Sequence, residues 1–191
     1  MKNSKKLSDK LSGKNREVIP NIVFHIMTAI MKLMDFLGNH SSKNFQTLNL
    51  KPGQTVIDYG CVPARYIRNA SNTVGESGKV IAVDIHPLAI KKVKVKIEKF
   101  KLINVEAVLA EGYNTPIANE TADVIYALDV FHMIEQPQEF LTELSRLLKQ
   151  DGIIIIEDGH QPRSETIQKI KNSGVLKIIQ EGKFNVECKK K

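Results

Sequence analysis

The chain has 191 residues, of which 42% are hydrophobic and 26% are charged, and it contains no tryptophan. This composition is ordinary for a globular protein, so it excludes a disordered chain, and the length suits one domain rather than two large ones. The formal net charge of +7 would fit binding to nucleic acid or to an anionic membrane, so its distribution along the chain matters.

The positive charge is concentrated at the two ends of the chain. Residues 1–16 hold six basic residues against Asp9 alone, and residues 189–191 are three lysines. The remaining residues, 17–188, carry a net charge of −1. We therefore predict a basic flexible tail over residues 1–16, a nearly neutral folded body, and no nucleic-acid partner.

Cysteine content and apolar runs bear on the cellular compartment. The two cysteines, Cys61 and Cys188, provide neither a disulfide framework nor a metal-binding spacing, and no secretory signal is recognisable, so we predict a cytoplasmic protein. The longest apolar stretch, 22–37, is interrupted by His25, Lys32 and Asp35, which argues against stable insertion into a membrane.

The first predicted element is a helix from Pro20 to Leu37, within an N-terminal region spanning residues 17–49. It either packs on the rest of the domain or caps a ligand site, and we favour the cap. Four side chains would then offer an adaptable apolar wall, namely Phe24, Met27, Met31 and Met34. The alternative use of this apolar helix is a homodimer contact.

Strands and helices then alternate through residues 50–191. The predicted strands are Thr55–Asp58, Lys79–Asp84, Val105–Ala110, Ala122–Leu128 and Ile153–Ile156, and the helices between or after them are 87–101, 137–148 and 164–173. Residues 176–179 and 184–188 form a terminal hairpin. This order indicates an α/β fold whose mostly parallel sheet is covered on both faces.

Acidic residues follow the predicted strands of this sheet. They are Asp58, Asp84, Glu111, Asp129 and Asp158. Open parallel sheets bind ligands at the carboxyl ends of their strands, and an acid at the end of the second strand can accept hydrogen bonds from ribose hydroxyls. Gly60, directly after the first acid and Tyr59, lets the backbone turn sharply beside a ligand.

Several motifs in this order resemble those of class I S-adenosylmethionine-dependent methyltransferases of the small-molecule type. They are Val56-Ile57-Asp58-Tyr59-Gly60-Cys61, Ala82-Val83-Asp84-Ile85 followed by Pro87, Ala122-Asp123-Val124-Ile125, and Leu148-Lys149-Gln150-Asp151-Gly152. The resemblance covers roughly residues 50–188. It implies a Rossmann-like, doubly wound sheet of seven strands with a terminal antiparallel hairpin, over a methyltransferase-like domain at 50–191.

The resemblance also implies a cofactor, S-adenosylmethionine, and residues that bind it. Asp58, Gly60 and Cys61 would line its methionine end, and Asp84 and Ile85 would hold the ribose and pack on adenine. Glu111 and Gly112 would flank the adenine edge, with Asp129 and Val130 near the transferring methyl group.

The first motif departs from the family pattern, because two of its glycines are replaced by Val62 and Ala64. Val62 is β-branched, resists positive φ, and projects where the cofactor would approach the backbone, whereas Ala64 is a milder change. Two functions remain open. One is a methyltransferase acting on a small-molecule or lipid-like acceptor, and the other is a methyltransferase-like binding or scaffold protein that cannot bind the cofactor.

Candidates for contact with the acceptor, or for proton removal, are His132, Asp158 and His160, which follow the fourth and fifth strands. A metal site built from these three is conceivable in ligand type, but no spacing supports it, so we predict no metal. With only two cysteines, the chain also lacks the thiolates expected of the arsenite methyltransferases that the domain otherwise resembles.

Overall fold

The computed structural model describes residues 19–37 and 45–191, so the predicted basic tail at 1–16 lies outside the described part. The helices are α2 (Asn21–Leu37), α4 (Ile67–Val74), α5 (Pro87–Phe100), α6 (Pro137–Leu147) and α7 (Arg163–Ser173), with a short 3-10 helix η1 (Phe131–Met133). The strands are β1 (Thr55–Tyr59), β2 (Lys79–Asp84), β3 (Val105–Leu109), β4 (Ala122–Ala127), β5 (Leu148–Glu157), β6 (Leu176–Glu181) and β7 (Asn185–Lys190).

The seven strands form one sheet in the order β3-β2-β1-β4-β5-β7-β6. The first five run parallel, whereas β7 pairs antiparallel with both β5 and β6. This confirms the predicted mostly parallel sheet with a terminal antiparallel hairpin. The strand order reverses between β1 and β4, which places the switch point of the fold at the middle of the sheet.

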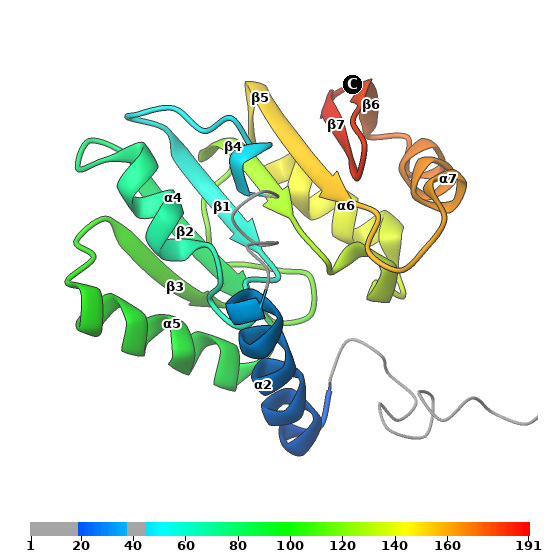
Figure 1. The fold of residues 1–191 in the computed structure, drawn as a ribbon. Helices are drawn as coiled ribbons and strands as arrows, with labels where there is room; N and C mark the ends of the chain where they lie inside the picture. Colours follow the sequence, from blue (N-terminus) through cyan, green and yellow to red (C-terminus); the bar gives the residue numbers. More distant parts are fainter. Residues whose placement is uncertain (1–18, 38–44) are drawn as a thin grey trace, which may run out of the picture.

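Helices cover both faces of the sheet, with α4 and α5 on one side and α6 and α7 on the other (Figure 1). Successive residues of a strand point to opposite faces. In β1, Ile57 therefore packs toward α6 while Val56 packs toward α4, and both side chains are fully buried. Burial on both faces explains why the strands are continuous apolar runs.

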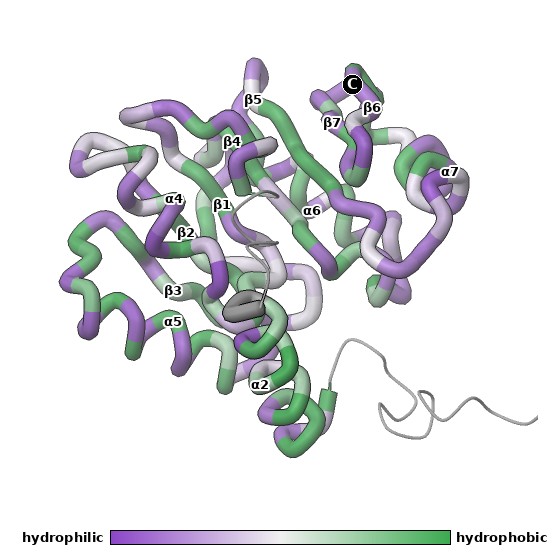
Figure 2. Tube along the Cα trace, in the orientation of Figure 1, coloured by the Kyte–Doolittle hydropathy of each residue, from purple (hydrophilic) through white to green (hydrophobic). Residues whose placement is uncertain are grey.

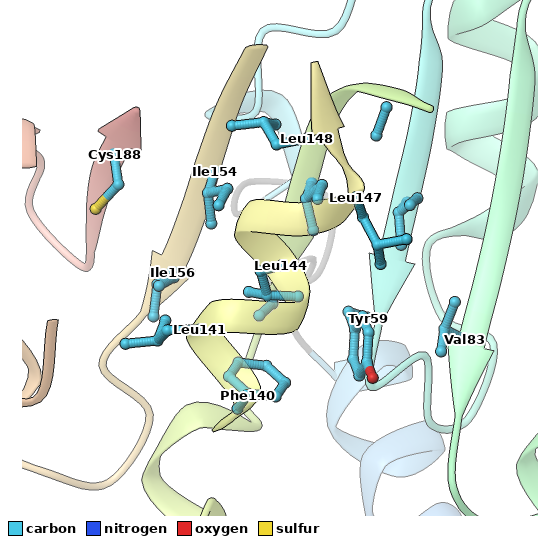
Figure 3. Packing of buried hydrophobic residues seen from close by; sticks show 14 of the residues in the cluster. Tyr59, Val83, Phe140, Leu141, Leu144, Leu147, Leu148, Ile154, Ile156 and Cys188 are labelled. Carbon is cyan, nitrogen blue, oxygen red and sulfur yellow. The ribbon is translucent and has the colours of Figure 1, made fainter. Parts of the chain in front are cut away.

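Helix α6 anchors one of these faces. Phe140, Leu141 and Leu144 project from it into the buried cluster that also holds Ile154 and Ile156 of β5, and all five side chains are at most 1% exposed (Figure 3). Burying each aliphatic side chain of this size stabilises the fold by about 1.5–3 kcal/mol. This packing fixes the strands whose carboxyl ends carry the candidate site.

Two features differ from the expectations. Helix α4 was not predicted, because its sequence, IRNASNTV, is short and half polar. Strand β5 begins at Leu148, so the predicted turn at Asp151-Gly152 lies within an irregular pairing with β4. No helix was predicted between β3 and β4, and residues 110–121 there form an irregular loop. Among the described helices, none combines the length and apolar character needed to cross a membrane.

Candidate functional site

A cavity of about 580 Å³ opens where the carboxyl ends of β1, β2 and β4 meet. One wall consists of residues that follow these strands, and the other consists of side chains from α2. Predicted cofactor residues that line the cavity are Asp58, Gly60, Cys61, Asp84, Ile85, Gly112, Asp129 and Val130. Of the three predicted catalytic residues, His132 and His160 also line it.

The turn after β1 depends on Gly60. Its φ is +82°, and a Cβ at this position would lie 2.9 Å from the Cβ of Val130, so a side chain is excluded on two grounds. The backbone N–H groups of Gly60 and Cys61 donate to the carbonyl oxygen of Val83 at 2.9 and 3.1 Å. The turn is therefore tied to β2 and packed against the loop after β4.

The backbone conformations of Val62 and Ala64, the two residues that replace glycines, differ from what the sequence suggests. Ala64, which was expected to be the milder change, carries the left-handed backbone with φ +63°, whereas Val62 does not have a positive φ. A non-glycine residue in this conformation costs about 1 kcal/mol. Val62 does line the cavity, so its side chain restricts the space beside the backbone without straining it. Nζ of Lys96 on α5 donates a hydrogen bond of 2.7 Å to the Ala64 carbonyl oxygen, which ties the turn to this helix.

Asp58 and Asp84 are buried carboxyls at the ends of β1 and β2. Among the described residues, neither carboxyl has a hydrogen-bond partner at its Oδ2 atom. Burial raises the pKa of Asp58 to about 8, with a further contribution from the charge of Asp84, while the nearby Tyr126 hydroxyl acts in the opposite direction. Burial also raises the pKa of Asp84 to about 6, although the backbone amides of His86, Val62 and Ile85 favour its ionised form.

Asp58 and Asp84 both line the cavity, so their unsatisfied oxygens fit a ligand that brings hydrogen-bond donors. S-adenosylmethionine carries ribose hydroxyls and an α-ammonium group, which are donors of the required kind. Ile85 is half-buried and offers an apolar contact for an adenine ring, and Gly112 contributes backbone without a side chain. The residues present thus fit the predicted cofactor.

Glu111 does not lie in the cavity lining, although it was predicted at the adenine edge. Its side chain is exposed, and its backbone pairs with Asn114 at 3.0 and 3.1 Å. Tyr113, which the sequence analysis missed, lines the cavity instead. The backbone carbonyl of Tyr113 accepts a hydrogen bond of 2.9 Å from the Tyr59 hydroxyl. The Tyr113 hydroxyl accepts one of 3.0 Å from the backbone N–H of Gln136.

Asp129, His132 and His160 meet at the opposite rim of the cavity. Oδ1 of Asp129 lies 3.9 Å from Nδ1 of His132 and 3.9 Å from Nε2 of His160. Asp158 is not part of this group, since its carboxylate accepts two hydrogen bonds of 2.9 Å from Nε of Arg163 and it does not line the cavity. The structure therefore places Asp129, rather than Asp158, with the two histidines.

Helix α2 forms the outer wall, where Met27, Met31 and Met34 line the cavity as predicted for a cap. Figure 2 shows the apolar character of this helix next to the more polar α5. Phe24, predicted in the same wall, is instead fully buried and stacks on His86. The Ile22 side chain remains 71% exposed on the outside of the helix.

His86 is a second residue whose role was missed, because a histidine before Pro87 gave only a helix-start signal. Its Nδ1 accepts from the Leu88 amide at 3.2 Å and caps α5, which leaves Nε2 to donate to the Ile19 carbonyl at 3.0 Å. Its own backbone N–H donates to Oδ1 of Asp84 at 2.8 Å. One residue thus joins the cap to the buried carboxyl of β2.

Comparisons with known proteins agree with this geometry. A family profile described as "Methyltransferase domain" matches residues 50–188. The chain is 31% identical over 122 residues to an arsenite methyltransferase of Halobacterium salinarum, covering 64% of this chain and 31% of the relative. It is 25% identical over 164 residues to a ubiquinone/menaquinone biosynthesis C-methyltransferase of Salmonella arizonae, covering 81% of this chain and 65% of the relative.

The matched regions span less than two thirds of the length of both curated relatives. Among solved structures, an S-adenosylmethionine-dependent methyltransferase from Aquifex aeolicus superposes with a TM-score of 0.68 at 28% identity, covering 78% of this chain and 88% of that one. The profile match includes the strand-end acids and the terminal hairpin. The chain therefore belongs to the methyltransferase-domain family, in its class I S-adenosylmethionine-dependent branch.

Proposed function

We propose that this chain is an enzyme that transfers a methyl group from S-adenosylmethionine to a small-molecule or lipid-like acceptor. The observation that carries the proposal is the pair of buried carboxyls, Asp58 and Asp84. Both residues line the cavity at the switch point of the sheet, and each has an oxygen without a hydrogen-bond partner among the described residues. Uncompensated buried carboxyls destabilise a fold, so their presence together is explained best by a ligand that completes them.

When bound, S-adenosylmethionine supplies the electrophilic methyl group on its sulfonium. Asp84 would accept hydrogen bonds from the ribose hydroxyls, and Asp58 would face the charged amino-acid end. Ile85 and Gly112 would border the adenine, and Asp129 and Val130 would border the reacting end. His132, at the same rim as Asp129, is positioned to hold a proton released by the acceptor.

The acceptor would occupy the space between these strand ends and α2. Met27, Met31 and Met34 give this side of the cavity an apolar and adaptable wall, which suits a hydrophobic acceptor and limits the access of water. Arsenite, the acceptor named for the Halobacterium relative, suits this chain less well. It needs thiolates, but burial raises the pKa of Cys188 to about 12 and that of Cys61 well above its ordinary value.

Cofactor binding is tested by calorimetry and thermal unfolding with S-adenosylmethionine and S-adenosylhomocysteine. A ligand at about 100 times its dissociation constant should stabilise the protein by about 2.7 kcal/mol. Asp84→Asn should remove most of this gain. Glu106→Gln is the control, because this exposed acid pairs only with the exposed Lys79 on the surface of the sheet and should leave the gain intact.

Absence of stabilisation by either ligand would instead support the alternative, a methyltransferase-like binding or scaffold protein. Once binding is established, transfer is measured as S-adenosylhomocysteine release with a panel of apolar phenols, quinols and lipids. Shortening the Met31 side chain by Met31→Ala should change the preference within the panel more than it changes cofactor affinity.

A further inference from the structure

We propose that Asp129, His132 and His160 form a binding site for one divalent transition-metal ion of the zinc class. These residues come from the loop after β4, from η1 and from the loop after β5. One ligand atom from each lies within 4.8 Å of the others, and the group is the only such set of three among the residues that the structure describes. The two imidazole rings stand nearly perpendicular with 4.9 Å between their centroids.

The ligand set determines which ions fit. Two imidazole nitrogens and one carboxylate oxygen are typical of zinc sites that keep open positions, and the same set also accepts cobalt, iron or manganese. Mg²⁺ and Ca²⁺ prefer all-oxygen sites and fit this group poorly. Zn²⁺ and Co²⁺ are therefore the appropriate probes.

The present spacing is slightly wider than a metal-bound site requires. Bond lengths of about 2.0–2.2 Å in tetrahedral geometry place ligand atoms about 3.3 Å apart. Each 3.9 Å distance to Asp129 must therefore close by roughly half an ångström, and the two imidazole nitrogens, which lie within 4.8 Å of each other, must also approach. The His160 side chain is 82% exposed and can make this adjustment by rotating about its own torsions. His132 is the fixed member, because its side chain is 17% exposed and a Cβ on the adjacent Gly159 would overlap its ring.

Asp129 is suited to be the charged ligand. Its backbone is left-handed with φ +55°, in the loop between β4 and η1, and its carboxylate is 41% exposed at the cavity rim. Asp158, the acid expected to join the two histidines, is held by Arg163 and is removed from the set. The three-ligand group thus combines one negative charge with two neutral imidazole donors, and all three residues line the cavity.

The position of the site suggests what the ion would do there. An oxygen atom of the acceptor could complete its coordination, which would favour acceptors that carry a hydroxyl or carbonyl group. With the ion bound, His132 serves as a ligand instead of the proton acceptor, and the ion itself would favour loss of a proton from an acceptor hydroxyl. This assignment of the acceptor rests on the proposed methyl transfer, whereas the metal site itself does not.

The test uses full-length protein without an affinity tag, stripped of metal with a chelator and titrated with Zn²⁺ by calorimetry and with Co²⁺ by visible absorption. We expect one ion per chain, and at least tenfold weaker binding in Asp129→Asn, His132→Gln and His160→Gln. His25→Gln is the matched control, because His25 is exposed on α2 outside the cavity lining, and its affinity should equal that of the wild type.

The exposed position of His160 means that His160→Gln should fold normally, so circular dichroism can verify that weaker binding is not a folding defect. Wild-type protein that binds neither ion, or a His132→Gln/His160→Gln double variant that retains full affinity, would overturn the site. Binding of S-adenosylhomocysteine is measured in the same samples. Cofactor binding without metal binding refutes the metal site alone, and metal binding without cofactor binding refutes the proposed function alone.

Discussion

The ring of Phe24 lies stacked on the imidazole of His86, with 4.5 Å between the centroids and 22° between the planes. The contact joins the first turn of α2 to the turn between β2 and α5. His86 also bonds to Asp84, so the cap and the predicted ribose-binding carboxyl share one anchoring residue. Helix α2 is thereby held over the cavity by a buried aromatic pair, although much of its surface is exposed.

Removal of the Phe24 ring should release the cap. We expect Phe24→Ala to lower the free energy of unfolding by about 3 kcal/mol and to increase the cleavage of α2 by protease, because the helix loses its main buried contact. Limited proteolysis followed by mass spectrometry measures the effect. Ile22→Ala, on the exposed side of α2, is the control. Equal protection of α2 in the two variants would contradict the anchoring role.

The stability of the ligand-free protein should decrease as the pH rises from about 4 to about 8. Asp58 and Asp84 bind protons more tightly in the folded state, where their pKa values are raised to about 8 and about 6, than in the unfolded chain. The folded state therefore retains protons that the unfolded state has already lost, and stability falls across this range. Above about pH 8 this contribution is fully lost.

Urea unfolding at several pH values measures this dependence, and Asp58→Asn should flatten it. At pH 8 the variant should be more stable than the wild type by more than about 1 kcal/mol, because an amide does not ionise. Its affinity for S-adenosylmethionine should fall at the same time. A variant with the same pH dependence as the wild type would show that Asp58 does not titrate in this range.

A side chain at position 60 should prevent formation of the turn. We expect Gly60→Ala to lower the free energy of unfolding by at least about 1 kcal/mol and to abolish cofactor binding, because of the positive φ and the contact with Val130. Val130→Ala should recover only part of the steric cost when combined with Gly60→Ala, because alanine removes the two Cγ atoms but keeps the Cβ that lies 2.9 Å from the added methyl group. A double-mutant cycle by urea unfolding separates the two effects, and strict additivity would exclude the contact.

The two departures from the glycine motif should respond differently to restoration. Ala64→Gly should stabilise the protein by about 0.5–1 kcal/mol, because glycine accepts the left-handed backbone more readily than alanine does. Val62→Gly should not stabilise the protein, but it should tighten S-adenosylmethionine binding by clearing the cavity wall. Thermal unfolding and calorimetry of both variants check these outcomes. Unchanged or weaker affinity in Val62→Gly would show that Val62 does not limit the pocket.

Periodicity and strand-end chemistry predicted most of the sheet, because burial on both faces leaves apolar runs that polar turns interrupt. Helix α4 was missed because its buried face consists of Ile67, Ala70, Ser71 and Val74, of which only Ile67 and Val74 are large and apolar, and two such residues in eight give little periodic signal. The order of the strands in space also left no local trace in the sequence.

Only part of the candidate site was predictable, because sequence position indicates the edge of the sheet on which a residue lies but not its contacts. A strand-end position predicts that an acid lies at the correct edge of the sheet, but it does not predict which neighbour binds it. Asp158 follows a strand as Asp129 does. The carboxylate of Asp158, however, accepts hydrogen bonds from Arg163, which lies five residues further along the chain. The role of His86 depends on Phe24 and Ile19, which lie more than 60 positions away in the chain.

The cavity draws its two walls from different parts of the chain, with the strand ends on one side and the single helix α2 on the other (Figure 1). Changes at Met27 or Met31 can therefore reshape the acceptor side without touching the carboxyls of β1 and β2. Under the proposed function, acceptor preference could therefore change through a few substitutions in one helix while the cofactor side on the sheet stays unchanged.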